Sequence, residues 1–248
     1  MHLQRELIDP AALDPENRQA LAKKLYALHE RIFSGVSLAD FEHKVISPPS
    51  AWTRIQLLQN ARGEWVGYEA LHRYRFRLSG RELSVFRAQA GILKPYRGQG
   101  SSFHFGLRQT LGYKLCHPAA RTFLLFTLVH PSSYHLLAQH CHELYPHPLH
   151  PTPPPIRALI HDLAAAFDEP RPPLADTPEI RQVGWITRDD EDDTAFWQTS
   201  TQPDVRYFLR VNPGYGLGHG LLTLVPVSWK NLLLSMLPRC CRPRWQPG

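Results

Sequence analysis

The sequence predicts a mixed α/β fold in which a mostly antiparallel central sheet is flanked by helices, with an extra helical segment toward the C-terminus. Three observations predict this class. Apolar residues recur at helical spacing over residues 15–32, strand-type patterns separated by glycine turns fill residues 52–93, and a nearly continuous apolar run covers residues 121–129. Because helical patterns precede and follow the strand patterns, helices are expected on the faces of the sheet.

The composition is that of a soluble globular protein. Of the 248 residues, 43% are hydrophobic and 20% are charged, and the formal net charge of +6 suits a phosphorylated cofactor. We expect no nucleic-acid partner, because no long run of Lys and Arg is interleaved with aromatic residues. The N-terminus lacks the apolar run of a signal peptide and the cysteines lack metal-knuckle spacing, so a cytoplasmic location is expected.

A strand over residues 2–8 and two helices are predicted before the main sheet. Asp14 is expected to cap the first helix, with Pro15 at the first helical position and apolar residues at helical spacing up to Ile32. This helix should have about five turns. A second, shorter helix is predicted to begin at Ser37 and to stop before the next prolines.

An antiparallel meander of three strands is predicted next. The strands cover residues 52–59, 65–78 and 83–93, with turns at Gly63 and Gly80 between them. In the second half of the middle strand, arginines alternate with aromatic or aliphatic residues. Because side chains alternate between the faces of a strand, this pattern predicts one basic and one apolar face.

The rest of the chain is expected to add helices and strands in alternation. The predicted elements are a helix from the glycine turn to near Gly112, a strand over 121–129, helices over 132–144 and 156–168, and strands over 180–187 and 221–227. An acidic turn at 189–193 and an aromatic segment at 196–208 lie between the last two strands. The predicted organisation is a core over residues 1–150, an extension over 151–228 that completes the sheet around the inserted helix 156–168, and an amphipathic, cationic tail over 229–248.

The most informative segment is the glycine turn at residues 97–102, which lies between a predicted strand and a predicted helix. Glycines at 98 and 100 allow a tight turn and close approach by a ligand, while amide N–H groups at the helix start point toward it. Such a nest is suited to a pyrophosphate. A Walker loop needs Gly-Lys-Ser/Thr and a dinucleotide fingerprint needs a third glycine, so the segment matches neither motif.

This segment resembles the acyl-CoA loop of the GNAT (N-acetyltransferase) superfamily, Arg/Gln-x-x-Gly-x-Gly/Ala. Here it reads Arg97-x-x-Gly100-x-Ser102, so serine stands where the family usually has glycine or alanine. The order of predicted elements matches that family over about residues 2–145. The resemblance implies a GNAT-like fold and an enzyme that transfers an acyl group, with acetyl expected, from CoA to an amine on a small molecule or peptide.

The resemblance also implies how the cosubstrate, acetyl-CoA or another acyl-CoA, is held. Backbone groups near Ile92 and Lys94 would pair with the pantetheine arm as an added strand. The pyrophosphate would be bound by amides of the loop, which comprises Arg97, Gly98, Gln99, Gly100, Ser101 and Ser102.

Three residues are candidates for acid–base catalysis. Family members often supply the acid as a tyrosine on the helix after the fifth strand, which implies Tyr134, although packing in the core is an equally good interpretation. Glu82, near the start of the strand that leads to the loop, is either the base or an ordinary exposed carboxylate. His130, at the end of the apolar strand, is a rival base because imidazole titrates near neutrality.

Two alternatives to acetyl transfer stay open. The first alternative is a long-chain acyltransferase. The second is a non-catalytic module that binds CoA or acyl groups and associates peripherally with a membrane or a partner through residues 229–245. The competing interpretation of that segment is a last helix packed on the core. The histidines between residues 130 and 161 lack ligand spacing, so no metal is expected. The sequence predicts neither the acceptor nor the oligomeric state.

Overall fold

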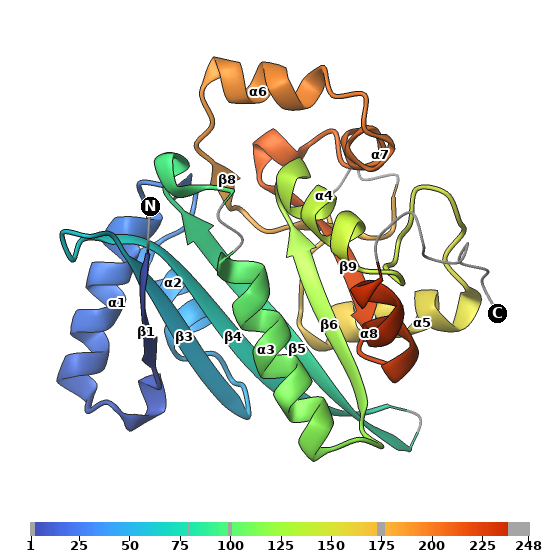
Figure 1. The fold of residues 1–248 in the computed structure, drawn as a ribbon, viewed down its shortest axis with the longest axis horizontal. Coiled ribbons are helices and arrows are strands. Elements are labelled where there is room, and N and C mark those ends of the chain that lie inside the picture. Colours follow the sequence, from blue (N-terminus) through green and yellow to red (C-terminus); the bar gives the residue numbers. More distant parts are fainter. Residues whose placement is uncertain (1–2, 79, 99–100, 173–176, 238–248) are drawn as a thin grey trace. The chain divides into compact units, whose positions relative to one another are not determined.

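The computed structural model describes residues 3–78, 80–98, 101–172 and 177–237, with only the backbone of residues 101–103. The chain forms two compact units, residues 1–122 and 123–248. In each unit an antiparallel set of strands is accompanied by helices (Figure 1). The predicted fold class, a mixed α/β fold with mostly antiparallel pairing, is therefore confirmed.

In the first unit, strands of the main sheet lie in the order β1-β3-β4-β5, and each is paired antiparallel with the next. They are β1 (Gln4–Ile8), β3 (Trp52–Gln59), β4 (Trp65–Leu78) and β5 (Arg81–Ile92). These bounds agree with the predicted strands to within two residues. The agreement has a local cause, because Gly63 and Gly80 both have φ of +74° in the turns between the strands.

Helices cover both faces of this sheet. On one face, His29 of α1 (Pro15–His29) places Nδ1 2.9 Å from the Tyr68 hydroxyl of β4. On the other, Tyr113 of α3 (Ser101–Cys116) places its hydroxyl 2.7 Å from Ser84 Oγ of β5. Tyr68 and Ser84 are on opposite faces because Ser84 pairs with Arg75, an odd number of residues from Tyr68 along β4. Figure 1 shows α3 in front of these strands.

Two helices of the first unit differ in length from the prediction. α1 ends at His29 and has about four turns rather than five, because the chain turns there into the short strand β2 (Phe33–Ser34). α3 continues past Gly112 to its end at Cys116, since a single glycine weakens a helix without breaking it. The shorter helix begins as predicted, as α2 (Leu38–Phe41), and continues in a π-helical turn over Glu42–Ile46.

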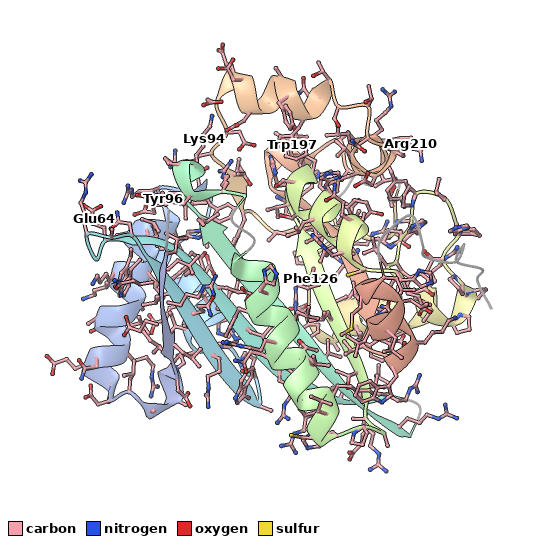
Figure 2. The ribbon with its side chains drawn as sticks, in the orientation of Figure 1. Glu64, Lys94, Tyr96, Phe126, Trp197 and Arg210 are labelled. Carbon is pink, nitrogen blue, oxygen red and sulfur yellow. The ribbon has the colours of Figure 1, made fainter. Side chains whose placement is uncertain are left out.

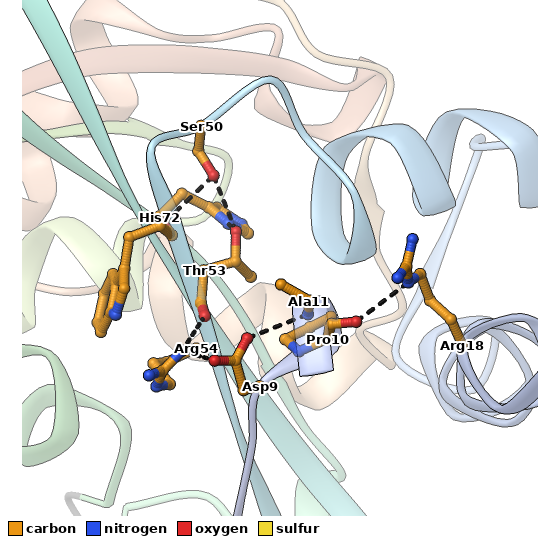
Figure 3. Close-up of polar contacts among 9 residues, drawn as sticks. Asp9, Pro10, Ala11, Arg18, Ser50, Thr53, Arg54 and His72 are labelled. Carbon is orange, nitrogen blue, oxygen red and sulfur yellow. Dashed lines mark hydrogen bonds and ion pairs between the residues drawn. The ribbon is translucent and has the colours of Figure 1, made fainter. Parts of the chain in front are cut away.

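A polar network fixes the N-terminal part of this unit (Figure 3). Arg54 of β3 forms an ion pair with Asp9, which also caps the 3-10 turn η1 (Pro10–Ala12). Next to this pair along β3, Thr53 Oγ1 lies 2.9 Å from Nδ1 of the fully buried His72. Burial lowers the pKa of His72 to about 4, so the imidazole is neutral at neutral pH.

The second unit has its own antiparallel strands and a larger share of helix. Its strands β6 (Arg121–Leu128), β9 (His219–Pro226) and β7 (Ile180–Gln182) are adjacent in that order. Its helices are α4 (Pro131–His140), α5 (Pro154–Ala166), α6 (Glu191–Gln198), α7 (Pro203–Val211) and α8 (Trp229–Met236). The predicted strands 121–129 and 221–227 and the predicted helix 156–168 are thus present with small shifts.

Two expectations for the middle of this unit are wrong. The predicted strand 180–187 is interrupted, because Gly184 has φ of +80° and the chain bends before the short strand β8 (Ile186–Thr187). The acidic segment predicted as a turn begins a helix instead. Asp190 caps α6 by accepting the Asp193 N–H, and carboxylates are favourable in the first turn of a helix.

The predicted helix 132–144 is also too long, because α4 ends at His140. Tyr145 exchanges backbone hydrogen bonds with Leu224 of β9, which commits the chain to extended pairing. The aromatic segment 196–208, to which the sequence analysis assigns no element, contributes to α6 and α7.

We predict that alanine has different effects at two glycines of α3. At Gly112 an added Cβ meets nothing within 4 Å, so Gly112→Ala should raise the free energy of unfolding by roughly 0.5–1 kcal/mol through helix propensity. At Gly106 the Cβ would lie 3.0 Å from Glu69 Oε1, so Gly106→Ala should gain less or lose stability. Urea unfolding of both variants measures the difference, and an equal gain in both would contradict the packing of Glu69 against α3.

Candidate functional site

The backbone pairing of β5, the strand that leads to the predicted loop, with β4 ends at a defined hydrogen bond. The N–H of Leu93 donates to the Val66 carbonyl of β4 at 2.9 Å. Because main-chain groups alternate in direction along a strand, those of Ile92 point away from β4. The chain then leaves the sheet through the 3-10 turn η3 (Lys94–Tyr96). The hydrogen bonds between β4 and β5 therefore end next to Ile92 and Lys94, where the resemblance implies that the backbone pairs with pantetheine.

The loop after this turn depends on one glycine. Gly98 has φ of +80°, and an added Cβ there would meet no atom within 4 Å. Glycine is thus needed for its backbone conformation rather than for space. Gln99 and Gly100 lie outside the described residues, and α3 begins directly after them at Ser101. Ser101 and Ser102 occupy the first turn of α3, where backbone N–H groups have no acceptor within the helix.

The base of the loop is fastened by an apolar cluster and a hydrogen bond. The cluster consists of the buried Leu3, Leu58 and Val66 with Ile92, Leu93 and Tyr96 packed against them. The side-chain amide of Asn60 donates to the Tyr96 hydroxyl at 3.2 Å and to Glu64 at 2.6 Å. Figure 2 shows Glu64 at the β3–β4 turn near Tyr96. The turn that precedes the loop is therefore held against the β3–β4 turn and the strand ends beside it.

A buried carboxyl group that the sequence analysis missed lies on the α3 face of β4. Glu69 exposes 4% of its surface and accepts a hydrogen bond from the Gly106 backbone of α3. Burial raises the pKa of Glu69 well above its usual value, so the protonated form is favoured. The available signal was a single glutamate within the apolar part of a predicted strand.

The first unit does not bring Glu82 to the loop. Glu82 is exposed and pairs across the hairpin with Arg77, close to the β4–β5 turn. The strand from Glu82 to Ile92 spans about 33 Å at 3.3 Å per residue. This geometry favours the interpretation of Glu82 as an ordinary exposed carboxylate.

In the second unit, the side chain of Tyr134 is in the core. It has no exposed surface, its hydroxyl donates to the Pro146 carbonyl at 2.8 Å, and its ring centroid lies 5.9 Å from that of Phe208. Burial raises the pKa of Tyr134 well above its usual value. The interpretation of Tyr134 as a packing residue is the one that these contacts favour.

His130 is the centre of a polar cluster in the same unit. Its Nε2 lies 2.7 Å from Asp189 Oδ2, and its Nδ1 lies 2.7 Å from Ser132 Oγ. If Nε2 carries the proton toward the carboxylate, Nδ1 is the acceptor for the Ser132 hydroxyl. The ring also meets Trp197 of α6 edge to face, with centroids 5.7 Å apart. Asp189 is far from His130 in the sequence, so no local pattern indicated this pair.

The predicted site residues are thus divided between the units. The loop and Glu82 belong to the first unit, whereas His130 and Tyr134 belong to the second. Within the part of the chain that the structure describes, no three His, Cys, Asp or Glu side chains form a group able to hold a metal ion.

Comparison with known proteins gives structural likeness only. No family model and no curated protein matches this chain. A probable N-acyltransferase of Enterococcus faecalis is similar at 11% identity and a TM-score of 0.35, over 56% of this chain and 33% of that one. The chain therefore matches about a third of the length of that relative.

Two further solved structures are acetyltransferases. NAA60 of Arabidopsis thaliana, in complex with acetyl-CoA, is 14% identical with a TM-score of 0.35, over 57% of this chain and 87% of that one. An aminoglycoside acetyltransferase from an uncultured soil metagenomic sample is 18% identical with a TM-score of 0.31, over 52% and 80% of the two chains. At these identities and TM-scores the likenesses carry no argument about the family or the activity of this chain.

We predict that Glu69 makes the fold less stable as pH rises. Because its folded-state pKa lies above the ordinary value of 4.5, the folded state holds a proton that the unfolded state releases, and stability falls as pH rises from that value toward the folded pKa. Glu69→Gln keeps the hydrogen-bonding capacity without the titration. Its unfolding midpoint relative to wild type should therefore be higher near pH 8 than near pH 5.

The matched control for this experiment is Glu82→Gln, which removes an exposed carboxylate of the same sheet. It should leave the pH dependence of the midpoint unchanged. A pH-independent difference between Glu69→Gln and wild type would contradict the raised pKa of Glu69.

Proposed function

We propose that this chain is an acyl-CoA-dependent N-acyltransferase, with acetyl as the expected acyl group, in which an amine attacks the thioester directly. The observation that supports this most is the junction from β5 to α3. There the main chain of Ile92 is directed away from β4, Gly98 has φ of +80°, and a helix begins at Ser101.

Each part of this junction suits a different part of CoA. The main-chain groups of Ile92 that point away from β4 can pair with the amides of pantetheine through main-chain hydrogen bonds of the strand type. The N–H groups at the start of α3 and the positive end of its dipole favour a diphosphate. Arg97, directly before Gly98, adds a positive charge on the same loop.

The reaction needs little covalent participation by the protein. The amine nitrogen forms a bond to the thioester carbon, the carbon–sulfur bond breaks, and the thiolate leaves and takes up a proton. A base must receive the proton that the amine loses. Among the candidates His130 has the most suitable surroundings, because Asp189 is placed to stabilise the imidazolium and Ser132 Oγ lies at Nδ1.

We predict that Gly98→Ala weakens acetyl-CoA binding at least roughly fivefold, since a left-handed conformation costs a non-glycine residue about 1–2 kcal/mol. Isothermal titration calorimetry measures the affinity. The matched control is Gly63→Ala, because Gly63 has a similar φ of +74° and equally open surroundings in the β3–β4 turn. That variant should lose stability and keep its affinity. Equal affinities for Gly98→Ala and wild type would count against the loop as the cofactor site.

Thermal shift with a series of acyl-CoA chain lengths tests the class of cosubstrate. A ligand that binds the folded state raises its stability in proportion to the logarithm of ligand over dissociation constant. Acetyl-CoA should stabilise the protein at least as well as longer acyl-CoA molecules. Stronger stabilisation by long chains would select a long-chain acyltransferase, and no shift with any of them would remove the proposal.

We predict that His130→Ala lowers kcat about 100-fold or more, the usual effect of losing a general base, while acetyl-CoA affinity stays unchanged. CoA release in the presence of an amine and peptide pool measures kcat. Tyr134→Phe is the contrasting variant. It should destabilise the fold by about 0.5–1.5 kcal/mol through the lost hydrogen bond to Pro146, with little change in kcat. A normal rate in His130→Ala would exclude His130 as the base.

A further inference from the structure

The last described helix, α8, is attached to the second unit by its polar side. Asn231 exposes only 3% of its surface, and its Oδ1 accepts the Glu143 N–H at 2.8 Å. Its Nδ2 donates to the backbone carbonyls of Glu143 and Pro226. One turn later, Ser235 Oγ accepts the His142 N–H at 2.9 Å. Hydrogen bonds from polar side chains therefore anchor α8, together with the half-buried Leu232 and Leu234 on either side of Asn231.

The apolar side of α8 is turned toward solvent. Leu233 is 62% exposed and Met236 is 67% exposed, and Trp229 and Leu237 flank them at 39% and 40%. At 3.6 residues per turn these four positions fall within an arc of about 100°. Asn231 lies on the opposite side of the helix. An exposed apolar stripe of this kind marks a surface that another phase or molecule covers.

The charge of residues 229–248 indicates which kind of partner could cover the exposed apolar stripe of α8. Residues 229–248 contain no Asp or Glu, and their basic residues are Arg239, Arg242 and Arg244 besides Lys230, whose Nζ lies 3.4 Å from Glu143 Oε1. Residues 238–248 lie outside the described part of the chain, so only their charge enters the argument. Two copies of this segment would repel one another, whereas an anionic surface would attract it.

We propose that α8 docks on the surface of an anionic membrane, with Leu233 and Met236 inserted among the acyl chains and the net positive charge of residues 229–248 attracting the anionic lipids. Apolar and aromatic residues on one side with cations beside them are the composition of helices that lie in the bilayer interface. Within the part of the chain that the structure describes, no helix has the length and apolar character needed to cross a bilayer. The inference does not depend on acyl-CoA binding, because α8 and the loop are tested by separate measurements.

Vesicle co-sedimentation of the full chain tests this proposal. The vesicles are phosphatidylcholine alone and phosphatidylcholine mixed with phosphatidylserine. Wild type should bind the mixed vesicles more tightly, and added salt should weaken that binding because it screens the cationic segment. The double variant Leu233→Gln/Met236→Gln should bind at least roughly tenfold more weakly, because two apolar side chains no longer enter the bilayer.

The matched control is Leu149→Gln/Leu217→Gln, which changes two leucines of the same unit that are each 71% exposed. It should bind like wild type, and acetyl-CoA affinity measured on all variants should be equal. Equal loss in the control and the α8 variant, or no preference for phosphatidylserine, would overturn the proposal. So would a wild-type dimer in light scattering that the α8 variant converts to a monomer, because a second copy would then cover the stripe.

Discussion

The register between β4 and β5 is the constraint on which the first unit depends. The two strands pair from Gly67 opposite Ile92 to Leu78 opposite Arg81. A slip of one residue would move every side chain of a strand to the other face. Tyr68 would then leave the face that α1 covers, and Glu69 would leave the face that α3 covers. The same register determines that Ile92, and not Leu93, directs its main chain outward at the entry to the loop.

Burial disfavours the charged form of three polar side chains that lie in the middle of β4 or pack against it. His29 and His72 both have their pKa lowered to about 4 by burial, and the pKa of Glu69 is raised by the same cause. Each neutral group is less costly to bury than its ion, provided that it has a hydrogen-bond partner. The partner of Glu69 is the backbone of α3. If α3 moved away, the buried carboxyl group would lose this hydrogen bond, so Glu69 helps to hold in place the helix that follows the loop. Stability and the position of the loop are therefore linked through one side chain.

The sequence predicts the first unit well because its signals are local. Glycines with positive φ end the strands, and Ser37 and Asp14 cap the helices that they precede. The second unit depends more on contacts between distant segments. No pattern near Tyr145 in the sequence predicts its backbone pairing with Leu224. No pattern near His130 predicts its contact with Asp189. The orientation of α8 also depends on a distant segment. Its leucines predict a buried apolar face, whereas hydrogen bonds to the carbonyls of Glu143 and Pro226 turn Asn231 inward.

The outward orientation of α8 leaves the burial of two apolar side chains available to a partner surface. Turning the helix by half a turn would bury Leu233 and Met236, which is worth about 1.5–3 kcal/mol for each side chain. The hydrogen bonds of Asn231 that hold the present orientation contribute about 0.5–1.5 kcal/mol each. The two sums are of similar size, and the half-buried Leu232 and Leu234 and the hydrogen bond of Ser235 add to the present orientation. Internal contacts can therefore hold α8 as it is, but they leave Leu233 and Met236 exposed. The orientation gains a clear advantage when an apolar phase outside the protein receives the stripe, because burial of the leucine and methionine is then added to the hydrogen bonds of Asn231.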